Sequence, residues 1–200
     1  MTLVFATNNA HKLEEVRQIL PSVYRIMSLH EIGFEHEIDE TGDTLEANSL
    51  LKAQTVWQWL QTHYDHSIDG VFADDTGLEI EALNNEPGVR TARWAGEDKD
   101  DAANRKKALT LLSGQTNRTA RFRTVITLIR RIGTTLQTEQ VEGCVHGLMA
   151  EEEVGDHGFG YDAVFVPEGY DKTFAQLPAE VKNSISHRAR AVEQLKLRLV

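Results

Sequence analysis

Hydrophobic positions along the chain follow two periods, one typical of strands and one typical of helices. Short apolar or alternating runs predict strands at 2–6, 71–73, 78–83, 120–131, 136–149 and 163–166, with short strands and turns over 22–40. Apolar residues three or four apart predict helices from Lys12 or Leu13 to before Pro21, from Asp43 or Thr44 to about His63, over 100–112, and from Ser184 or Ser186 onward. Because strict βαβ alternation is missing, this order predicts an α/β fold with a mixed sheet.

The predicted helix that ends near His63 has two different sides. Its apolar stripe is formed by Leu50, Ala53, Trp57 and Leu60. At 100° per residue, Asn48 and Lys52 lie opposite that stripe. Helix geometry alone therefore favours a solvent-exposed face for these two polar residues.

Length and composition describe an ordinary globular protein. The 200 residues, 40% of them hydrophobic and 26% charged, suit a single domain over 1–200 or two lobes that share one sheet. No run approaches the roughly 18 to 20 apolar residues of a membrane span, and the N-terminus resembles a first strand more than a signal peptide. The single cysteine, Cys144, excludes an internal disulfide, so we expect a cytoplasmic protein with no membrane partner.

The formal net charge of −10 argues against general nucleic-acid binding. A basic run covers 118–131, but Arg121 and Arg123 are two apart in a predicted strand, so a shared solvated face is the simpler interpretation. If the substrate is an anion, local lysines or a bound divalent cation must offset the acidity of the chain.

A polar loop follows the first predicted strand and leads into a helix. Backbone N–H groups at a helix N-terminus favour anions, and Lys12 adds a full positive charge. The loop is not a P-loop, because the GxxxxGK[ST] spacing is missing. It is a candidate phosphate cradle, formed by Thr7, Asn8, Asn9, Ala10, His11 and Lys12.

Two carboxylates, Asp74 and Asp75, come at the end of a predicted buried strand. Desolvated charges are costly without a partner, and alternation lets only one of the two face a given site. Either a metal ligand or general base, or a carboxylate that caps a turn before Gly77, would account for the pair. Glu40 could supply a second oxygen ligand to a hard cation.

Two further segments combine glycine, aromatic and basic residues. The segment 158–162 reads Gly-Phe-Gly-Tyr-Asp, which suits either an aromatic stacked on a base or a tight turn with core aromatics. The segment 182–188 places Lys182, His187 and Arg188 near the expected start of the last helix. Basic residues at a helix start oppose the macrodipole, which indicates an anion-binding site.

The order of these motifs resembles the inosine triphosphate pyrophosphatase family. The resemblance is carried by ATNNAHK at 6–12, ETGDTLEANSLLKA at 40–53, FADDTGLEIEAL at 72–83, EPGVRTARWAGE at 86–97, GFGYDAVF at 158–165 and KNSISHRARA at 182–191. It implies an elongated, two-lobed α/β fold with a long mixed central sheet flanked by helices and a substrate groove between the lobes. It also implies a Mg²⁺-dependent homodimer that hydrolyses ITP, dITP and XTP to the monophosphate and pyrophosphate and so cleanses the nucleotide pool.

The same resemblance assigns roles to residues. Asp75 matches the catalytic carboxylate, and Glu40 and Asp75 match the metal ligands. The triphosphate would be bound by residues 7–12 and Lys52, and Thr76 replaces a substrate-binding serine. The base and ribose site corresponds to Phe159, Gly160, Tyr161, Asp162, Lys182, His187 and Arg188. Ala47 stands where many members have glutamate, with Glu46 one position earlier, so the role of that position is not carried over.

Hydrogen-bond polarity suggests how the base is selected. His187 and Arg188 offer donors, which match the 6-oxo group of hypoxanthine and xanthine but oppose the 6-amino group of adenine. The competing functions are a pyrophosphatase for standard or pyrimidine nucleotides and a nucleotide-binding sensor without turnover. If only Asp75 faces the site, replacement of Asp74 should cost far less activity than replacement of Asp75.

Overall fold

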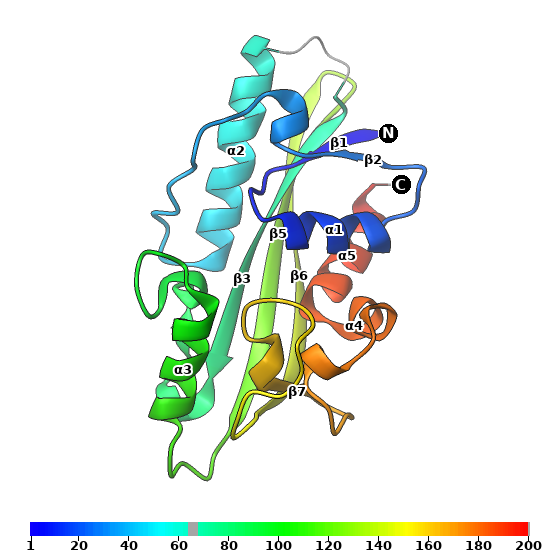
Figure 1. Ribbon diagram of the computed structural model, residues 1–200. Helices are drawn as coiled ribbons and strands as arrows, with labels where there is room; N and C mark the ends of the chain where they lie inside the picture. The colour runs from blue at the N-terminus through cyan, green and yellow to red at the C-terminus, as the bar shows by residue number, and fades with distance from the viewer. Residues whose placement is uncertain (64–67, 200) are drawn as a thin grey trace. The chain divides into compact units, whose positions relative to one another are not determined.

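The structure is a computed structural model that describes residues 1–63 and 68–199 (Figure 1). Within these ranges seven strands form one sheet in the order β2-β1-β3-β5-β6-β7, with β4 paired to β3. The strands are β1 Thr2–Phe5, β2 Arg25–Met27, β3 Gly70–Ile80, β4 Glu86–Gly88, β5 Thr119–Ile132, β6 Thr135–Met149 and β7 Phe165–Pro167. The helices are α1 Ala10–Ile19, α2 Leu45–His63, α3 Asp101–Leu111, α4 Ala179–Ile185 and α5 His187–Arg198.

The sheet is mixed, as the sequence predicted. Strand β1 pairs in parallel with β2 and β3, whereas β4 runs antiparallel to β3 and β7 antiparallel to β6. The chain divides into two compact units. Unit 1 comprises Met1–Asp75, Thr124–Gly143 and Arg188–Val200, and unit 2 comprises Thr76–Arg123 and Cys144–His187.

In unit 1, the two faces of the sheet are covered by different helices (Figure 1). Val71 and Ala73 of β3 pack in one hydrophobic cluster with Ala53 and Val56 of α2. Phe72, between them in sequence, packs on the other face with residues of α1 and α5. Strand alternation therefore directs successive β3 side chains toward α2 and toward the α1–α5 pair in turn.

Helix α2 begins where the sequence predicted, and Ala53, Trp57 and Leu60 of the predicted apolar stripe are buried, but part of the opposite side is buried as well. The Thr44 hydroxyl accepts the N–H of Ala47 and caps the helix. Leu50 is only half-buried, whereas Asn48 and Lys52 are 2% and 8% exposed. The prediction of a solvent-exposed face for these two polar residues is wrong, because hydrogen-bond partners from other segments make their burial possible.

Strand β3 runs without a break through Asp74 and Asp75 to Ile80. The sequence predicted two strands here, 71–73 and 78–83, with a possible turn between them. Both aspartates lie inside the strand, so neither caps a turn. Residues 81–83 form a 3₁₀ helix instead of the end of a strand.

Unit 2 is built around an aromatic core that includes Phe122, Phe165 and Phe174. Helix α3 begins as predicted, since the Asp100 carboxylate accepts the N–H of Ala103 at 3.0 Å. The strand predicted over 163–166 is shifted, because Asp162–Val164 forms a 3₁₀ helix and β7 begins at Phe165.

The single helix predicted at the C-terminal end is two helices, α4 and α5. Ser186 separates them in extended backbone, with φ −65° and ψ 161°. Lys182 therefore lies late in α4, not at a helix start, while His187 and Arg188 are the first residues of α5. The inward positions of the last helix are as predicted: Ala189, Val192 and Leu195 of α5 are buried, as is Leu199 directly after it.

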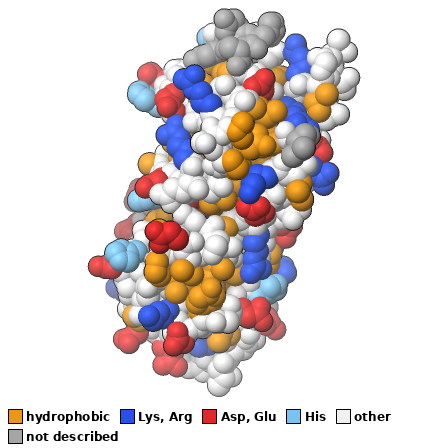
Figure 2. All heavy atoms as spheres, turned by 90° about the vertical axis from the view of Figure 1, so that its right-hand side faces the viewer, with side chains coloured by type: hydrophobic (Ala, Val, Ile, Leu, Met, Phe, Trp, Pro, Cys, Tyr) orange, Lys and Arg blue, Asp and Glu red, His pale blue; other side chains and the backbone are white. Residues whose placement is uncertain are grey.

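Charged side chains of both signs are interspersed over the face drawn in Figure 2. Arg121 and Arg123 share one face of β5, as predicted, since both pair with Glu79, at 2.6 and 3.3 Å. Among the described helices, none combines the length and hydropathy of a membrane span.

Candidate active site

The loop after β1 is held by its own side chains and leads directly into α1. The Asn9 carboxamide accepts the N–H of Lys12 at 3.1 Å, and the Asn9 N–H donates to the Thr7 hydroxyl at 3.1 Å. Asn9 is thus the N-cap, and α1 begins at Ala10, two or three residues earlier than predicted. Lys12 consequently lies in the first turn of the helix, while residues 8–11 are exposed.

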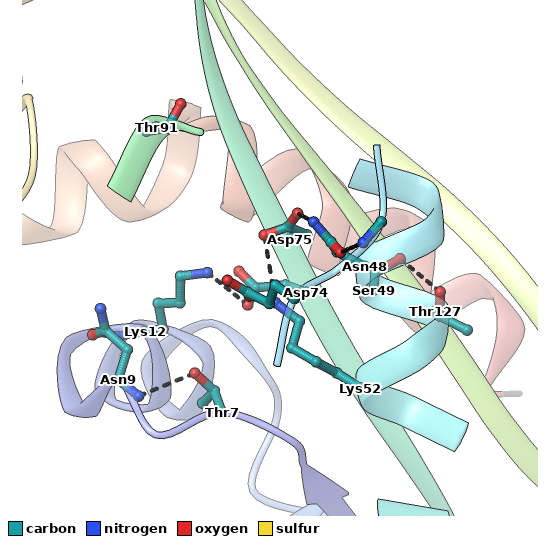
Figure 3. Close-up of polar contacts among 12 residues, drawn as sticks. Thr7, Asn9, Lys12, Asn48, Ser49, Lys52, Asp74, Asp75, Thr91 and Thr127 are labelled. Atoms are coloured by element: carbon teal, nitrogen blue, oxygen red, sulfur yellow. Dashed lines mark hydrogen bonds and ion pairs between the residues drawn. The ribbon is translucent and has the colours of Figure 1, made fainter. Parts of the chain in front are cut away.

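Asp74 is the centre of a buried ion network (Figure 3). One carboxylate oxygen accepts from Lys12 Nζ at 2.9 Å and the other from Arg188 Nε at 3.1 Å. A second nitrogen of Arg188 donates to Glu15 at 2.5 Å. Asp74 and Arg188 are each 1% exposed. Burial would raise the pKa of Asp74, but Lys12 and Arg188 outweigh burial and hold that pKa far below its usual range.

Asp75 faces the other side of β3 and has different partners. Asn48 donates to it at 3.2 Å, and Lys52 Nζ lies 3.4 Å from its other oxygen (Figure 3). Burial raises the pKa of Asp75, and the attraction of Lys52 and Lys12 only partly offsets burial. A carboxylate with a raised pKa takes a proton more readily, which suits a general base. The predicted alternation of faces at Asp74 and Asp75 is confirmed by their separate partners.

Glu40 and Asp75 converge on one ammonium group. Lys52 Nζ is 2.5 Å from Glu40 and 3.4 Å from Asp75. Burial would lower the pKa of Lys52, but these two carboxylates outweigh burial and raise it. We define the acid–lysine cluster of unit 1 as Lys12, Glu15, Glu40, Asn48, Lys52, Asp74, Asp75 and Arg188. Within it, the Lys52 ammonium bridges Glu40 and Asp75.

The donor set of the acid–lysine cluster fits Mg²⁺. In the described part of the chain, no three or more His, Cys, Asp or Glu side chains gather as a metal site. Mg²⁺, however, is usually held by one or two carboxylates together with water and substrate phosphates. Glu40 and Asp75 provide that number of hard oxygen ligands.

In unit 2, Asp162 ties a loop to a helix. One of its oxygens accepts the Phe159 N–H at 2.9 Å and Lys182 Nζ at 2.5 Å. The Lys182 ammonium also lies 4.8 Å from the centre of the Phe159 ring and 5.9 Å from that of Phe174. Asp162 and Lys182 are both buried.

His187 belongs to the same group of rings. Its imidazole stacks on Phe122 with ring centres 4.6 Å apart and lies 6.5 Å from Phe174. The Tyr161 hydroxyl donates to the carbonyl of Thr91 at 3.0 Å, and burial raises its pKa. We define the aromatic cluster of unit 2 as Phe122, Phe159, Tyr161, Asp162, Phe174, Lys182 and His187. Phe159, the ring between the two glycines, is only half-buried.

Most of the predicted site residues fall into two groups. The acid–lysine cluster contains Glu40, Lys52 and Asp75 together with Lys12 and Arg188. The aromatic cluster contains Phe159, Tyr161, Asp162, Lys182 and His187. Gly160 and the half-buried Thr76 also belong to unit 2, and residues 7–11 form the loop of unit 1 described above. Ala47, at the departure from the usual motif, is exposed. Arg188, predicted to read the base, is paired instead with Asp74 and Glu15 in unit 1.

Besides Asp74, which the sequence analysis set apart from the site, two members of the acid–lysine cluster were missed. Glu15 is three residues after Lys12 and Asn48 is four residues before Lys52, so both lie on the same helix face as a predicted site lysine. That spacing is the signal from which they could have been found.

The fold and the acid–lysine cluster define an α/β protein with a buried cluster of carboxylates and basic side chains in unit 1. The family model described as the Ham1 family matches residues 3–198, and the chain belongs to that family. This confirms the resemblance stated from the sequence.

The chain is similar to other proteins over nearly its full length and theirs. The chain is 47% identical over 197 residues to a dITP/XTP pyrophosphatase of Flavobacterium johnsoniae, and the matched region covers 98% of this chain and 96% of the relative. It is 49% identical over 195 residues to one of Porphyromonas gingivalis, covering 97% and 95%. The solved Ham1 protein of Staphylococcus aureus is 39% identical with a TM-score of 0.84, covering 100% of this chain and 98% of the other.

Proposed function

We propose that this protein hydrolyses non-standard purine nucleoside triphosphates (ITP, dITP and XTP) to the monophosphate and pyrophosphate, with Mg²⁺ as cofactor. The observation that carries the proposal is Asp75, a buried carboxylate with a raised pKa that shares the Lys52 ammonium with Glu40. The names of the relatives support the substrate class, since these proteins are called dITP/XTP pyrophosphatases.

The acid–lysine cluster binds the triphosphate. The N–H groups at the start of α1 and the ammonium groups of Lys12 and Lys52 balance its negative charge. A water oxygen attacks the α-phosphorus while the bond from that phosphorus to the bridging oxygen breaks, and pyrophosphate leaves with the bond electrons. Asp75 takes the proton of the attacking water or holds the cation that orients it, and in both roles it must be ionised.

Glu40 and Asp75 are the residues that would hold Mg²⁺. When bound, the ion neutralises charge that develops on the phosphates and lowers the pKa of a bound water. Lys52, whose ammonium lies between the two carboxylates, would pair with a phosphate of the bound triphosphate.

The aromatic cluster binds the base and ribose, with Phe159 as the stacking surface. His187 and Arg188 are proposed to donate to the 6-oxo group. Of these, His187 already belongs to the aromatic cluster. Arg188 would have to redirect part of its guanidinium away from Asp74 or Glu15, which makes its contribution more costly than that of His187.

We further propose a cytoplasmic homodimer, with one domain over 1–200 in each subunit, that cleanses the nucleotide pool without binding nucleic acid. The net charge of −10 supports the last point, because a duplex or single strand would be repelled. Light scattering of the purified protein tests the dimer, and a mobility shift with labelled DNA tests nucleic-acid binding.

A panel of triphosphates tests the reaction itself. Pyrophosphate release from ITP, dITP, XTP, ATP, GTP and pyrimidine triphosphates is measured with Mg²⁺ and with EDTA. We expect release from the first three, and loss of release with EDTA. Preference for a standard or pyrimidine nucleotide would contradict the substrate class, and tight binding without release would indicate a sensor.

A further inference from the structure

We propose that Asp101 and Arg105 of α3 are positioning residues that hold the loop 158–161 in the form that binds the base. Neither residue belongs to the site predicted from the sequence. The proposal rests on the proposed function, because it takes this loop to be the base-binding element. It concerns unit 2 alone.

The two side chains form hydrogen bonds to both backbone polar groups of Gly160. The Gly160 N–H donates to the Asp101 carboxylate at 2.7 Å, and Arg105 Nη1 donates to the Gly160 carbonyl at 2.9 Å. Asp101 and Arg105 are four residues apart on α3, so they lie on the same helix face one turn from each other. Hydrogen bonds to charged groups are among the stronger ones in proteins, and here two of them act on a single glycine.

The guanidinium of Arg105 is itself oriented by a carboxylate. Its Nε lies 2.8 Å from Glu153, while Nη1 reaches the Gly160 carbonyl. The planar guanidinium donates in fixed directions, so a bond at one nitrogen determines where the other nitrogens point. Glu153 therefore helps to fix the donor that holds Gly160.

The loop needs such restraint because of its glycines. Gly158 and Gly160 have φ of +78° and +61°, which side chains other than glycine rarely adopt, and glycine loses much conformational freedom when ordered. A Cβ at Gly158 would lie 2.1 Å from an Asp162 carboxylate oxygen, so the close approach of Asp162 requires glycine there. Without external bonds, a segment with two glycines would sample many conformations.

Two successive N–H groups of the loop are each bound by a different carboxylate. The Phe159 N–H donates to Asp162 and the Gly160 N–H to Asp101. The peptide planes on both sides of Phe159 are thereby fixed, and with them the direction of its Cα–Cβ bond, while its ring lies 4.8 Å from the Lys182 ammonium. A side chain that leaves a fixed backbone binds a base at a lower entropic cost than one on a freely moving loop.

Helix α3 holds a second loop of unit 2 in the same way. The buried Asn104 accepts the Ala95 N–H at 2.7 Å and donates to the Ala92 carbonyl at 2.9 Å. Tyr161 reaches this second loop through its hydrogen bond to Thr91. Polar side chains of α3 thus hold two loops of unit 2 through hydrogen bonds. These side chains therefore affect binding of the base although they do not contact it.

The test compares Arg105→Met and Asp101→Ala with Lys106→Met, an exposed position on the same helix. We expect KM for ITP to rise roughly 10-fold or more in the first two, the loss typical of a bond to a charged group. We expect kcat to stay within about threefold of wild type, because the reacting groups are untouched. Lys106→Met should behave as wild type.

Inorganic tripolyphosphate separates a local effect from general damage, because it has phosphates but no base. Its inhibition constant should be unchanged in all three variants. Asp101→Asn should retain much of the wild-type KM, since the amide oxygen still accepts the Gly160 N–H. Arg105→Lys should lie between wild type and Arg105→Met, because an ammonium cannot donate to Glu153 and Gly160 in the fixed geometry of a guanidinium.

Three results would overturn the proposal. A wild-type KM for ITP in both Arg105→Met and Asp101→Ala would show that the loop does not need these bonds. An equal loss for ITP and tripolyphosphate would indicate general structural damage. Absence of ITP hydrolysis and of ITP binding in the wild-type protein would refute the proposed function and this inference with it, and that result is seen before any variant is made.

Discussion

The acid–lysine cluster and the aromatic cluster are stabilised by different means. In the acid–lysine cluster, charged side chains bond to one another, as in the pairs Lys12–Asp74 and Lys52–Glu40. The aromatic cluster also contains such a pair, Lys182–Asp162, and its loop is held at the backbone, where Asp162 and Asp101 of α3 accept two successive N–H groups. Under the proposed function, the first arrangement would exchange partners when a polyphosphate binds. The second has little freedom and offers a fixed shape, which suits recognition of a flat base.

The same contrast exists within the acid–lysine cluster, between Asp74 and Asp75. Asp74 bonds to two cations, and its pKa is far below the usual range despite burial. Asp75 has an amide and a more distant ammonium as partners, and burial raises its pKa. The pKa values of these two adjacent residues are displaced in opposite directions. This difference indicates that Asp74 stabilises the structure and that Asp75 is the candidate catalytic carboxylate.

The largest expected effect is on turnover in Asp75→Asn. The change removes the proposed base or metal ligand while nearly preserving shape, so we expect kcat to fall by roughly 10³-fold or more. Steady-state pyrophosphate release at saturating Mg²⁺ measures it, with Glu14→Gln on the exposed side of α1 as control. Activity within about tenfold of wild type, well short of a catalytic-base effect, would contradict the assignment.

The wild-type pH profile should follow the same residue. Asp75 must be ionised to act, and its pKa lies above the usual value of about 3.9 because it is buried. Turnover should therefore be lost as pH falls through that raised pKa, at a higher pH than an ordinary aspartate would give. An acidic limb at or below the ordinary value would argue that another group controls activity.

The next effect is on stability in Asp74→Asn. The substitution leaves Lys12 and Arg188 as buried charges with a neutral partner, and we expect the free energy of unfolding to fall by about 3 kcal/mol near neutral pH. The sequence-based expectation that Asp74→Asn costs far less activity than Asp75→Asn stays a prediction, because it concerns turnover and not stability. Urea denaturation measures the loss.

The pH dependence of that loss has a definite sign. The folded pKa of Asp74 is lower than its unfolded value of about 3.9, so its stabilisation is complete above that value and disappears as pH falls through the folded pKa. The difference between wild type and Asp74→Asn should therefore shrink in acid. As a control, Glu31→Gln removes a half-exposed partner of Arg17 and should cost less than about 1 kcal/mol. A difference that grows in acid would refute the ion-pair explanation.

The ratio of kcat/KM for ITP to that for ATP should fall when His187 or Arg188 is replaced, and the His187 variant should be easier to interpret because Arg188 also pairs with Asp74 and Glu15. Loss of a donor to the 6-oxo group should lower kcat/KM for ITP by roughly 10- to 150-fold and leave that for ATP unchanged or higher. Kinetics on both nucleotides with His187→Ala and Arg188→Ala measures the ratio, with unfolding followed in parallel because Arg188 is buried among carboxylates. An ITP:ATP ratio equal to wild type in both variants would refute base readout by these residues.

The smallest expected effects are on ligand affinity, and they should differ between a lysine of the acid–lysine cluster and a lysine of the aromatic cluster. The sequence predicted that Lys12 and Lys182 both read phosphate from helix starts, but Lys182 lies late in α4 beside Asp162 and two rings. We now expect Lys12→Ala to weaken ITP binding by roughly tenfold and inosine binding little. Lys182→Ala should weaken both alike. Calorimetry with ITP and inosine decides, and a Lys182→Ala loss confined to ITP would restore the original prediction.

Local physics in the sequence was enough for the mixed α/β fold, the starts of α2 and α3 and the opposite faces of Asp74 and Asp75. Each depends on neighbours within a few residues: the cap at Thr44, the cap at Asp100, and the two-residue period of a strand. The Asn9 cap was not recognised, and α1 therefore begins earlier than predicted. The six motifs in order also sufficed to identify the family.

Tertiary structure decided which polar residues are buried. Helix geometry alone placed Asn48 and Lys52 in solvent, yet both are buried against Asp75, which lies 27 and 23 positions away in sequence. Arg188 is buried because Asp74 and Glu15 reach it across 114 and 173 positions. A helix period reports only the average polarity of a face, whereas the cost of burying a charge depends on whether an opposite charge is brought to it, and only the folded chain brings the two together.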